Sequence, residues 1–169
     1  ELNDEDDTIK VVSGTHITDY HAPGAYQWQY LPPIDKYADS LTVSGGWNAA
    51  NNCQTQTTLD PTQTVLDARY QGPGFGVGMI YDVFTGTVQI SNLTLSRGES
   101  NSIEHNVGII VNSQGGFFTI DNILVTAGRS GASDGKIATF NLYKPGTLKV
   151  RNSQFLNNSF THPNSGGVF

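Results

Sequence analysis

The side chains with the clearest binding chemistry gather between His16 and Asp39. Tyr26, Trp28 and Tyr30 occupy alternate positions in this stretch, so an extended backbone would place them on one face. Aromatic rings arranged in this way can stack on sugar rings, and the pattern therefore indicates a carbohydrate-binding platform. The alternative, which we favour on the sequence, is an N-terminal cap whose aromatic side chains cover the first unit of the fold.

Other reactive side chains are isolated in the sequence. His16 and His21 have no third metal ligand at a suitable spacing, so we predict no zinc site. Cys53 is the single cysteine, which excludes an internal disulfide. No neighbouring His or Lys would activate it as a nucleophile, and it fits a small buried side chain or a free thiol. We assign no catalytic residue and no metal ligand, and calcium is the one cofactor that the acidic surface would suit.

The elements that must position these side chains repeat every thirty residues from Gly86 to Phe169. Three segments align under one another: GTVQISNLTLSRG from Gly86, GFFTIDNILVTAG from Gly116 and GTLKVRNSQFLNN from Gly146. A fixed period of this size is typical of a stacked solenoid, in which residues one period apart become neighbours. An antiparallel sandwich or barrel would not require such a period.

Asn92, Asn122 and Asn152 fall in register and interrupt the alternation of apolar residues around them. The interruption marks a bend between two strands. A ladder in which each amide donates to the next would satisfy polar groups that a tight bend buries. We therefore interpret this column as a buried, structural Asn ladder rather than a catalytic site.

Further columns complete the repeating unit. Gly98, Gly128 and Asn158 align, and because glycine and asparagine tolerate positive φ best, we predict a left-handed backbone at these positions. Apolar columns within the aligned segments are Val88, Phe118 and Leu148; Ile90, Ile120 and Val150; and Leu95, Val125 and Phe155. A second strand region is predicted by two more columns thirty residues apart: Val77, Val107 and Ile137; and Ile80, Ile110 and Phe140.

Strands before residue 76 are shorter and less regular. We predict strands at 8–12 and 64–67, and a strand at 41–43 that ends in a turn at residues 44–46. Asp67 would end its strand by accepting a hydrogen bond from a turn amide, which is a structural role.

These patterns divide the chain into capping coils and loops over 1–75 and regular coils over 76–169, within a single domain over 1–169. The abrupt start at Glu1 and the end inside an apparent strand indicate the N-terminal fragment of a longer solenoid.

The composition favours strands and turns. Of 169 residues, 19 are Gly and only 14% are charged, and no convincing helical period is present. The net charge of −6 argues against a nucleic-acid partner. No apolar run has the length that a membrane-spanning segment needs.

The segments that carry a family resemblance are DDTIKVVSGTH, SLTVSGGWN, TVLDA and VQISNLTLSRG. They resemble the opening of bacterial right-handed parallel β-helix repeat proteins of the pectin-lyase-like superfamily. The end of the chain is similar to repeats of polymorphic outer-membrane proteins: Phe155-Leu-Asn-Asn158 matches their FxxN box, and Gly166-Gly-Val-Phe169 matches part of their GGA-aliphatic box. The resemblance implies an all-β, right-handed parallel β-helix located outside the cell or on its surface. The aromatic-rich stretch from His16 to Asp39 lies outside the resemblance, and we predict that it forms the N-terminal cap.

The resemblance also raises polysaccharide lyases and hydrolases, whose chemistry needs gathered acidic side chains. The acidic residues within the repeats fall in different columns: Asp82, Glu99, Glu104, Asp121 and Asp134. Glu99 aligns with Arg129, and Asp121 aligns with Arg151. We interpret each pair as a surface ion pair between neighbouring units, worth at most about 1 kcal/mol.

Three functions fit these observations. The first, which we favour, is a non-catalytic extracellular or cell-surface β-helix module for adhesion or glycan binding, with a polysaccharide or a host-cell glycan as partner. The second is a fragment of a polysaccharide lyase or hydrolase. The third is a structural surface protein that self-associates through an open C-terminal coil.

Overall fold

The computed structural model describes residues 6–17, 28–30, 40–70, 75–77, 86–100, 109–113, 116–130, 138–142 and 145–160. Strands dominate these ranges, and the helical elements among them are the two short 3-10 helices η1 (Ala49–Asn51) and η2 (Pro61–Gln63). The prediction of an all-β chain is confirmed for this part of the sequence. No helix within it is long and apolar enough to cross a membrane.

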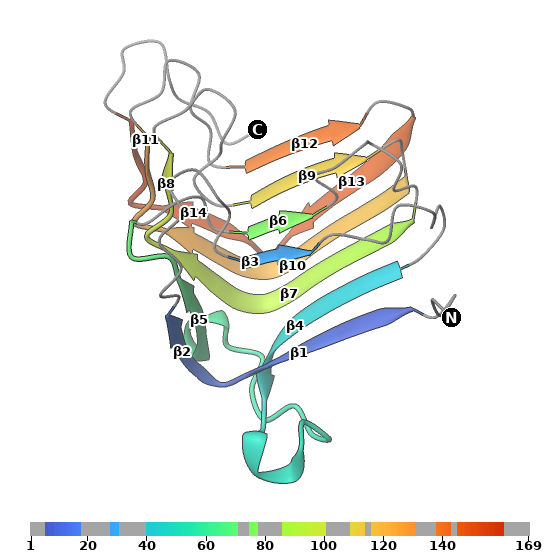
Figure 1. Cartoon of the computed structure of the whole chain (residues 1–169), viewed down its shortest axis with the longest axis vertical. Helices are drawn as coiled ribbons and strands as arrows, with labels where there is room; N and C mark the ends of the chain where they lie inside the picture. Colours follow the sequence, from blue (N-terminus) through green and yellow to red (C-terminus); the bar gives the residue numbers. More distant parts are fainter. Residues whose placement is uncertain are drawn as a thin grey trace.

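The strands form three sheets, and every strand pair within them is parallel (Figure 1). The main path of the largest sheet is β1 (Asp7–Val12), β4 (Ser40–Trp47), β7 (Thr87–Ser96), β10 (Gly116–Thr126) and β13 (Gly146–Arg151). Its other members are β2 (Gly14–Ile17), β5 (Thr64–Asp67) and β14 (Gln154–Leu156). The second sheet contains β3 (Trp28–Tyr30), β6 (Phe75–Val77), β9 (Ile109–Ser113) and β12 (Ala138–Leu142), and the third contains β8 (Glu99–Ser100), β11 (Arg129–Ser130) and β15 (Ser159–Phe160).

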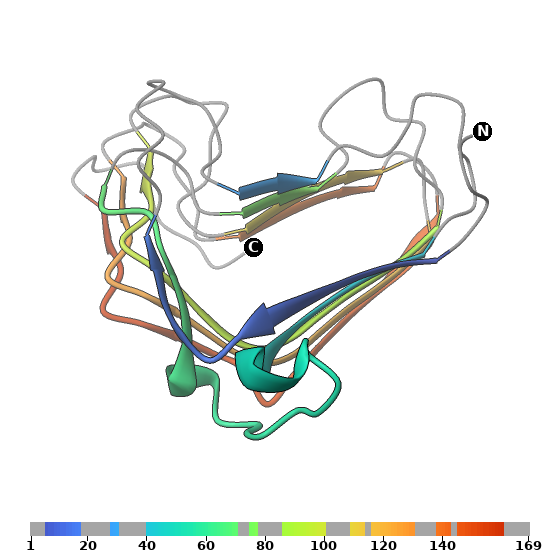
Figure 2. The same cartoon turned by 60° about the horizontal axis from the view of Figure 1, so that its bottom comes forward.

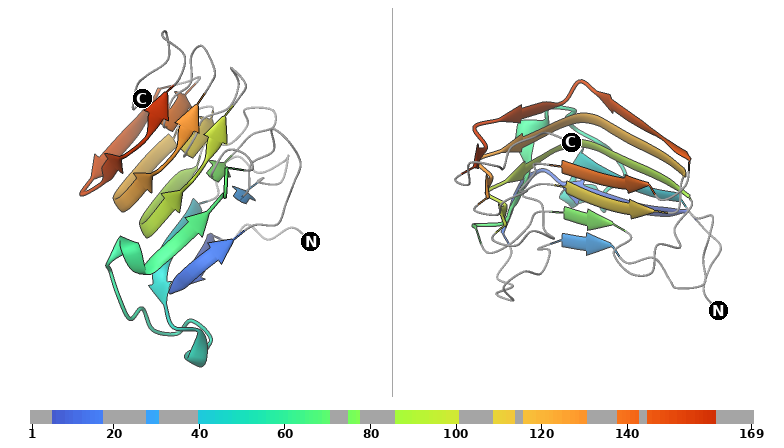
Figure 3. Two further views of the ribbon diagram at one scale, coloured as in Figure 1. Left: turned by 90° about the vertical axis from the view of Figure 1, so that its left-hand side faces the viewer. Right: turned by 90° about the horizontal axis from the view of Figure 1, so that it is seen from above.

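The thirty-residue period sets the register between β7, β10 and β13 of the largest sheet. Phe118 of β10 pairs with Val88 of β7 on one side and with Leu148 of β13 on the other. Gly116 pairs with Gly146 in the same ladder. The left-hand view of Figure 3 shows the strands stacked along one direction. The alignment of the three segments is therefore confirmed as a spatial alignment.

A bend at the Asn column folds this sheet into two arms. Asn92, Asn122 and Asn152 have φ values of 56°, 54° and 50°, so each adopts the left-handed conformation that asparagine tolerates better than most residues. In Figure 2 the four-stranded sheet lies across the open side of the two arms. The predicted bend is thus confirmed, and it encloses the apolar interior.

The core consists of apolar columns that point into this interior. Its buried members are Leu41, Val43, Leu66, Val88, Ile90, Leu93, Leu95, Phe118, Ile120, Ile123 and Val125. Leu148, Val150 and Phe155 continue the three predicted columns and are half-buried. Stacking like side chains on like fills the interior in the same way in each unit, which explains why the period conserves side-chain type as well as spacing.

The prediction of positive φ at Gly98, Gly128 and Asn158 is wrong. The left-handed residues lie one position earlier, at Arg97 (φ 53°), Ala127 (φ 54°) and Asn157 (φ 57°). Asn158 contributes through its side chain instead, because its Oδ1 accepts from the Gly128 amide at 2.9 Å and its Nδ2 donates to the Val125 carbonyl at 3.0 Å. The column of Gly98, Gly128 and Asn158 therefore predicts the position of the turn correctly, but the residue with positive φ is the one before it.

The predicted columns of the second strand region are also wrong in register. Val77 pairs with Val111 and not with Val107, and Val111 pairs with Phe140. The connection from this sheet back to the next long strand differs in length between units: Val77 precedes Gly86 by nine positions, whereas Val111 precedes Gly116 by five. The unequal connections change the separation of paired residues in this sheet, which is 34 positions between Val77 and Val111 and 29 positions between Val111 and Phe140.

Strand β4 does not end at Val43, as the turn predicted at residues 44–46 required, but runs on to Trp47. Close packing rather than a turn requires glycine here. A Cβ on Gly45 would lie 2.1 Å from the Asn92 carbonyl oxygen of the neighbouring strand, and Gly46 has φ 85°. The strands predicted at 8–12 and 64–67 are present as β1 and β5.

Truncation in the core should be costly. We expect Ile120→Ala to lower the free energy of unfolding by about 2–5 kcal/mol, because Ile120 is 2% exposed and stacks between apolar neighbours. Phe117→Ala on the same strand is the matched control, since Phe117 is 63% exposed and should cost less than about 1 kcal/mol. Urea denaturation of both variants measures the difference, and equal losses would contradict this packing.

Candidate functional site

The loop of residues 48–63 is inserted at the bend, where the neighbouring strand β7 has Asn92 and Leu93. β4 pairs with the first half of β7, through Val43 and Ile90, and β5 pairs with the second half, through Leu66 and Leu95. Between these halves β7 has only Asn92 and Leu93, whereas β4 and β5 are joined by the 48–63 loop. The extra residues leave the sheet at the bend and extend outward from it (Figure 2).

Hydrogen bonds close this loop at its base. The Gly46 amide donates to the buried Thr64 hydroxyl at 2.8 Å, and the Thr57 amide donates to the Gly46 carbonyl at 2.7 Å. On the far side, Lys10 Nζ donates to the Cys53 carbonyl at 2.9 Å and lies 4.2 Å from the centre of the Trp47 ring. The loop is therefore held by its own ends and by β1.

The second half of the loop turns back over the outer face of the bend. Thr94 of β7 donates its hydroxyl to the Pro61 carbonyl at 2.8 Å. Asn122 of β10 donates through Nδ2 to the Leu59 carbonyl. Two successive long strands thus hold the loop against the column of asparagines, although neither contact follows the thirty-residue period.

A groove of about 430 Å³ lies between the loop and the bend. Its lining residues are Leu59 from the loop, Gln89, Ser91 and Asn92 from β7, Asp121 and Asn122 from β10, and Asn152, which follows β13. Five of these side chains carry an amide or a carboxylate, one carries a hydroxyl, and one is apolar. Leu59 is 61% exposed, so an apolar side chain borders a polar surface.

The Asn ladder is confirmed for its first step and differs at the second. Asn122 Nδ2 donates to Asn92 Oδ1 at 2.9 Å, as predicted. Asn152 Nδ2 instead donates to Asp121 Oδ1 at 2.9 Å. The column is also not buried: Asn92 and Asn122 are half-buried, and Asn152 is exposed. The column lies on the outer face of the bend beside Asp121, whereas the residues that follow Asn92 and Asn122, Leu93 and Ile123, point into the core.

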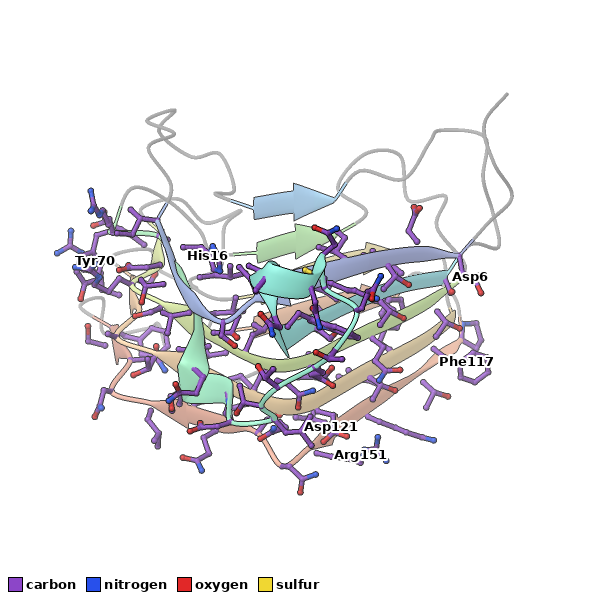
Figure 4. The ribbon with its side chains drawn as sticks, turned by 90° about the horizontal axis from the view of Figure 1, so that it is seen from below. Asp6, His16, Tyr70, Phe117, Asp121 and Arg151 are labelled. Atoms are coloured by element: carbon purple, nitrogen blue, oxygen red, sulfur yellow. The ribbon has the colours of Figure 1, made fainter. Side chains whose placement is uncertain are left out.

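Both predicted ion pairs between neighbouring units are present. Arg151 Nη2 donates to Asp121 Oδ2 at 3.0 Å, and Figure 4 shows the two side chains together on the outer face. Arg129 Nε donates to Glu99 Oε1 at 2.8 Å, and its guanidinium lies 4.1 Å from the centre of the Tyr70 ring. Both carboxylates are therefore held by arginine.

A third pair with the same spacing, Asp67 and Arg97, was missed by the sequence analysis. Arg97 Nε donates to Asp67 Oδ1 at 2.8 Å, and a second contact joins Arg97 Nη2 to Asp67 Oδ2. The Asp67 side chain is 8% exposed. It also accepts from the Arg69 amide at 3.0 Å, which confirms the predicted bond to a turn amide. The thirty-residue separation was the signal that could have revealed the pair.

This environment changes the pKa of both partners. Burial raises the pKa of Asp67, but hydrogen bonds from Arg97 and from the Arg69 amide, with the Arg97 charge, outweigh burial and the pKa is lowered. The hydrogen bond with Asp67 raises the pKa of Arg97. Asp67 is thus an ionised structural group.

The remaining candidate residues are dispersed. Trp28 and Tyr30 belong to β3, which pairs with β6 and lies on a different sheet from the groove. His16 Nε2 lies 2.9 Å from the Val12 carbonyl, and Cys53 is a half-buried free thiol in the 48–63 loop. The other predicted positions lie outside the described residues: Tyr26, His21, Asp82, Glu104 and Asp134. Among the described residues, no three His, Cys, Asp or Glu side chains gather as a metal site.

Substitutions at the bend should separate backbone strain from side-chain bonding. We expect Asn122→Ala to lower the free energy of unfolding by about 3 kcal/mol, since it removes two hydrogen bonds and puts alanine at positive φ. Asn122→Gly removes the same bonds without the strain and should cost roughly half as much. Thermal denaturation of the two variants checks this order, and a larger loss for glycine would contradict it.

The Asp67 pair should make stability depend on pH in the acid range. Its folded pKa lies below the unfolded value, so its contribution is complete above about pH 4 and disappears as the pH falls through the folded pKa. We expect Asp67→Asn to lower the free energy of unfolding by about 2 kcal/mol at pH 7. The difference in unfolding free energy between this variant and wild type should become smaller below about pH 4. Glu99→Gln, which removes a more exposed pair, is the control and should cost less than about 1 kcal/mol. Urea titrations measure this difference, and a difference in unfolding free energy that stays constant down to about pH 2 would refute this assignment.

Comparison with known proteins identifies no relative from which the role of this groove could be transferred. No protein-family model matches the sequence, and neither the curated proteins nor the solved structures contain a match. The groove at the bend, with its polar lining from three successive units, is the candidate functional site.

Proposed function

We propose that this chain is part of a right-handed parallel β-helix and serves as a non-catalytic carbohydrate-binding module of an extracellular or cell-surface protein. Parallel pairing at a separation of thirty residues, repeated from β7 to β13, supports the solenoid. So does the resemblance of four segments to pectin-lyase-like repeat proteins.

The observation that carries the choice of ligand is the groove between the 48–63 loop and the bend. Its amide, carboxylate and hydroxyl groups can donate and accept the many hydrogen bonds that sugar hydroxyls need. The exposed Leu59 offers an apolar surface for the C–H face of a sugar ring. A pocket for a typical apolar small molecule would have the opposite balance, with a mostly hydrophobic lining.

The charges near the groove favour binding over catalysis. A hydrolase needs one carboxylic acid that can give up a proton and a second carboxylate placed opposite it. Asp121 is instead engaged by Arg151 and Asn152, each of which donates to one of its oxygens. Glu99 of β8 is engaged by Arg129 of β11, the neighbouring strand in the third sheet. These contacts give both carboxylates a structural role.

A screen of the whole chain against immobilised oligosaccharides tests this function. We expect specific retention of at least one saccharide class, with a dissociation constant in the micromolar to millimolar range, because each polar contact contributes little in an open, wet site. The protein should not cleave these saccharides during incubation, as measured by reducing-end and ultraviolet assays. Retention of no saccharide would remove the binding proposal, and release of unsaturated or newly reducing products would favour a polysaccharide-degrading enzyme.

A further inference from the structure

The hydrogen bonds around the groove leave one half-buried acceptor unused. Asn122 donates its two amide protons to Leu59 and Asn92. Asn152, the next residue of the column, donates to Asp121 and not to Asn122. As a result, no described residue donates to Asn122 Oδ1. A half-buried carbonyl oxygen without a protein donor is a position where a ligand hydroxyl can bind.

Two further side chains of the lining keep free polar groups. Gln89 is exposed on the outer face of β7, and none of the described residues hydrogen-bonds to its amide. Asn92 accepts from Asn122, and its own amide protons have no acceptor within the described part of the chain. Each carboxamide combines donors with an acceptor on one planar group, so it can bind two neighbouring hydroxyls at once.

The spacing of these groups follows the stacking of the strands. Neighbouring parallel strands lie about 4.8 Å apart, so equivalent positions on β7, β10 and after β13 repeat at that distance. This interval is comparable to the length of one pyranose ring in an extended chain. A linear saccharide that lay along the stacking direction would therefore meet similar polar groups at each successive ring.

Charge selects the class of saccharide. Among the described residues that line the groove, Asp121 is the one with a charged side chain, and Arg151 engages it from outside the groove. An anionic sugar would find no cationic side chain among the described lining residues to compensate its charge, so desolvating that charge in a partly enclosed site costs free energy. A neutral sugar meets no such penalty and uses the hydroxyl, amide and apolar groups alone.

We propose that the groove between the 48–63 loop and the asparagine column binds a neutral linear saccharide along the stacking direction. Leu59 supports the C–H face of a ring, Gln89 and Asn92 bind its hydroxyls, and Asn122 Oδ1 accepts one hydroxyl proton. This inference rests on the proposed carbohydrate-binding function and assigns its place and its substrate class.

Isothermal titration of the whole chain with soluble probes tests the assignment. The neutral probes are hexamers of β-1,4-linked glucose, xylose, mannose and N-acetylglucosamine, and the anionic probe is a hexamer of galacturonate. We expect a neutral hexamer to bind, and Gln89→Ala and Leu59→Ser each to weaken that binding roughly tenfold. Both side chains are exposed, so neither variant should change the melting temperature.

Thr87→Ala is the matched control, because Thr87 is exposed on the same face of β7, two residues from Gln89, and does not line the groove. Its affinity should stay within about twofold of wild type. Binding of a neutral hexamer that both groove variants leave unchanged would overturn the assigned place while the carbohydrate-binding function stood. Tighter binding of galacturonate, lost in the groove variants, would overturn the assigned class. Failure of every saccharide to bind would overturn the function itself.

Discussion

The structure depends on one constraint, which is that successive long strands must bend at the same point to stay in register. Parallel pairing joins Phe118 to Val88 and to Leu148, so a bend displaced by one residue would break the ladder and turn core side chains outward. A left-handed residue makes the bend without interrupting either arm. Asparagine fills that position because it tolerates positive φ and its amide can bond across the strands.

The same constraint explains where the 48–63 loop can be inserted. At the bend, β4 and β5 each keep their pairing with β7, so added residues disturb neither arm. The loop must leave close to the next strand, and glycine at positions 45 and 46 provides the room. Outside the sheet, its second half turns back over the outer face of the bend. A scaffold rule thereby places a loop beside a column of amides and creates the groove.

The sequence predicted what obeys the period and failed where the period is broken. The apolar columns, the bend and the pairs of Asp121 with Arg151 and Glu99 with Arg129 follow from residues thirty apart. The register of the second sheet was not predicted correctly, because the connections to and from its strands vary in length. The groove was not predicted, because the contact between Asn122 and Leu59 joins residues 63 positions apart, and the thirty-residue repeat does not encode that separation.

The residue type at one position, Asp121, interrupts the asparagine ladder at the groove. Position 91 on β7 is serine, and the amide of Asn122 therefore bonds to Asn92 in the preceding unit. The equivalent position on β10 is Asp121, whose charged oxygens are stronger acceptors than a neutral amide. Asn152 accordingly donates to Asp121, and Asn122 Oδ1 loses its donor. The acceptor that no described residue uses thus arises from a change of residue type in one column, from Ser91 to Asp121, while the backbone of the bend stays the same in all three units.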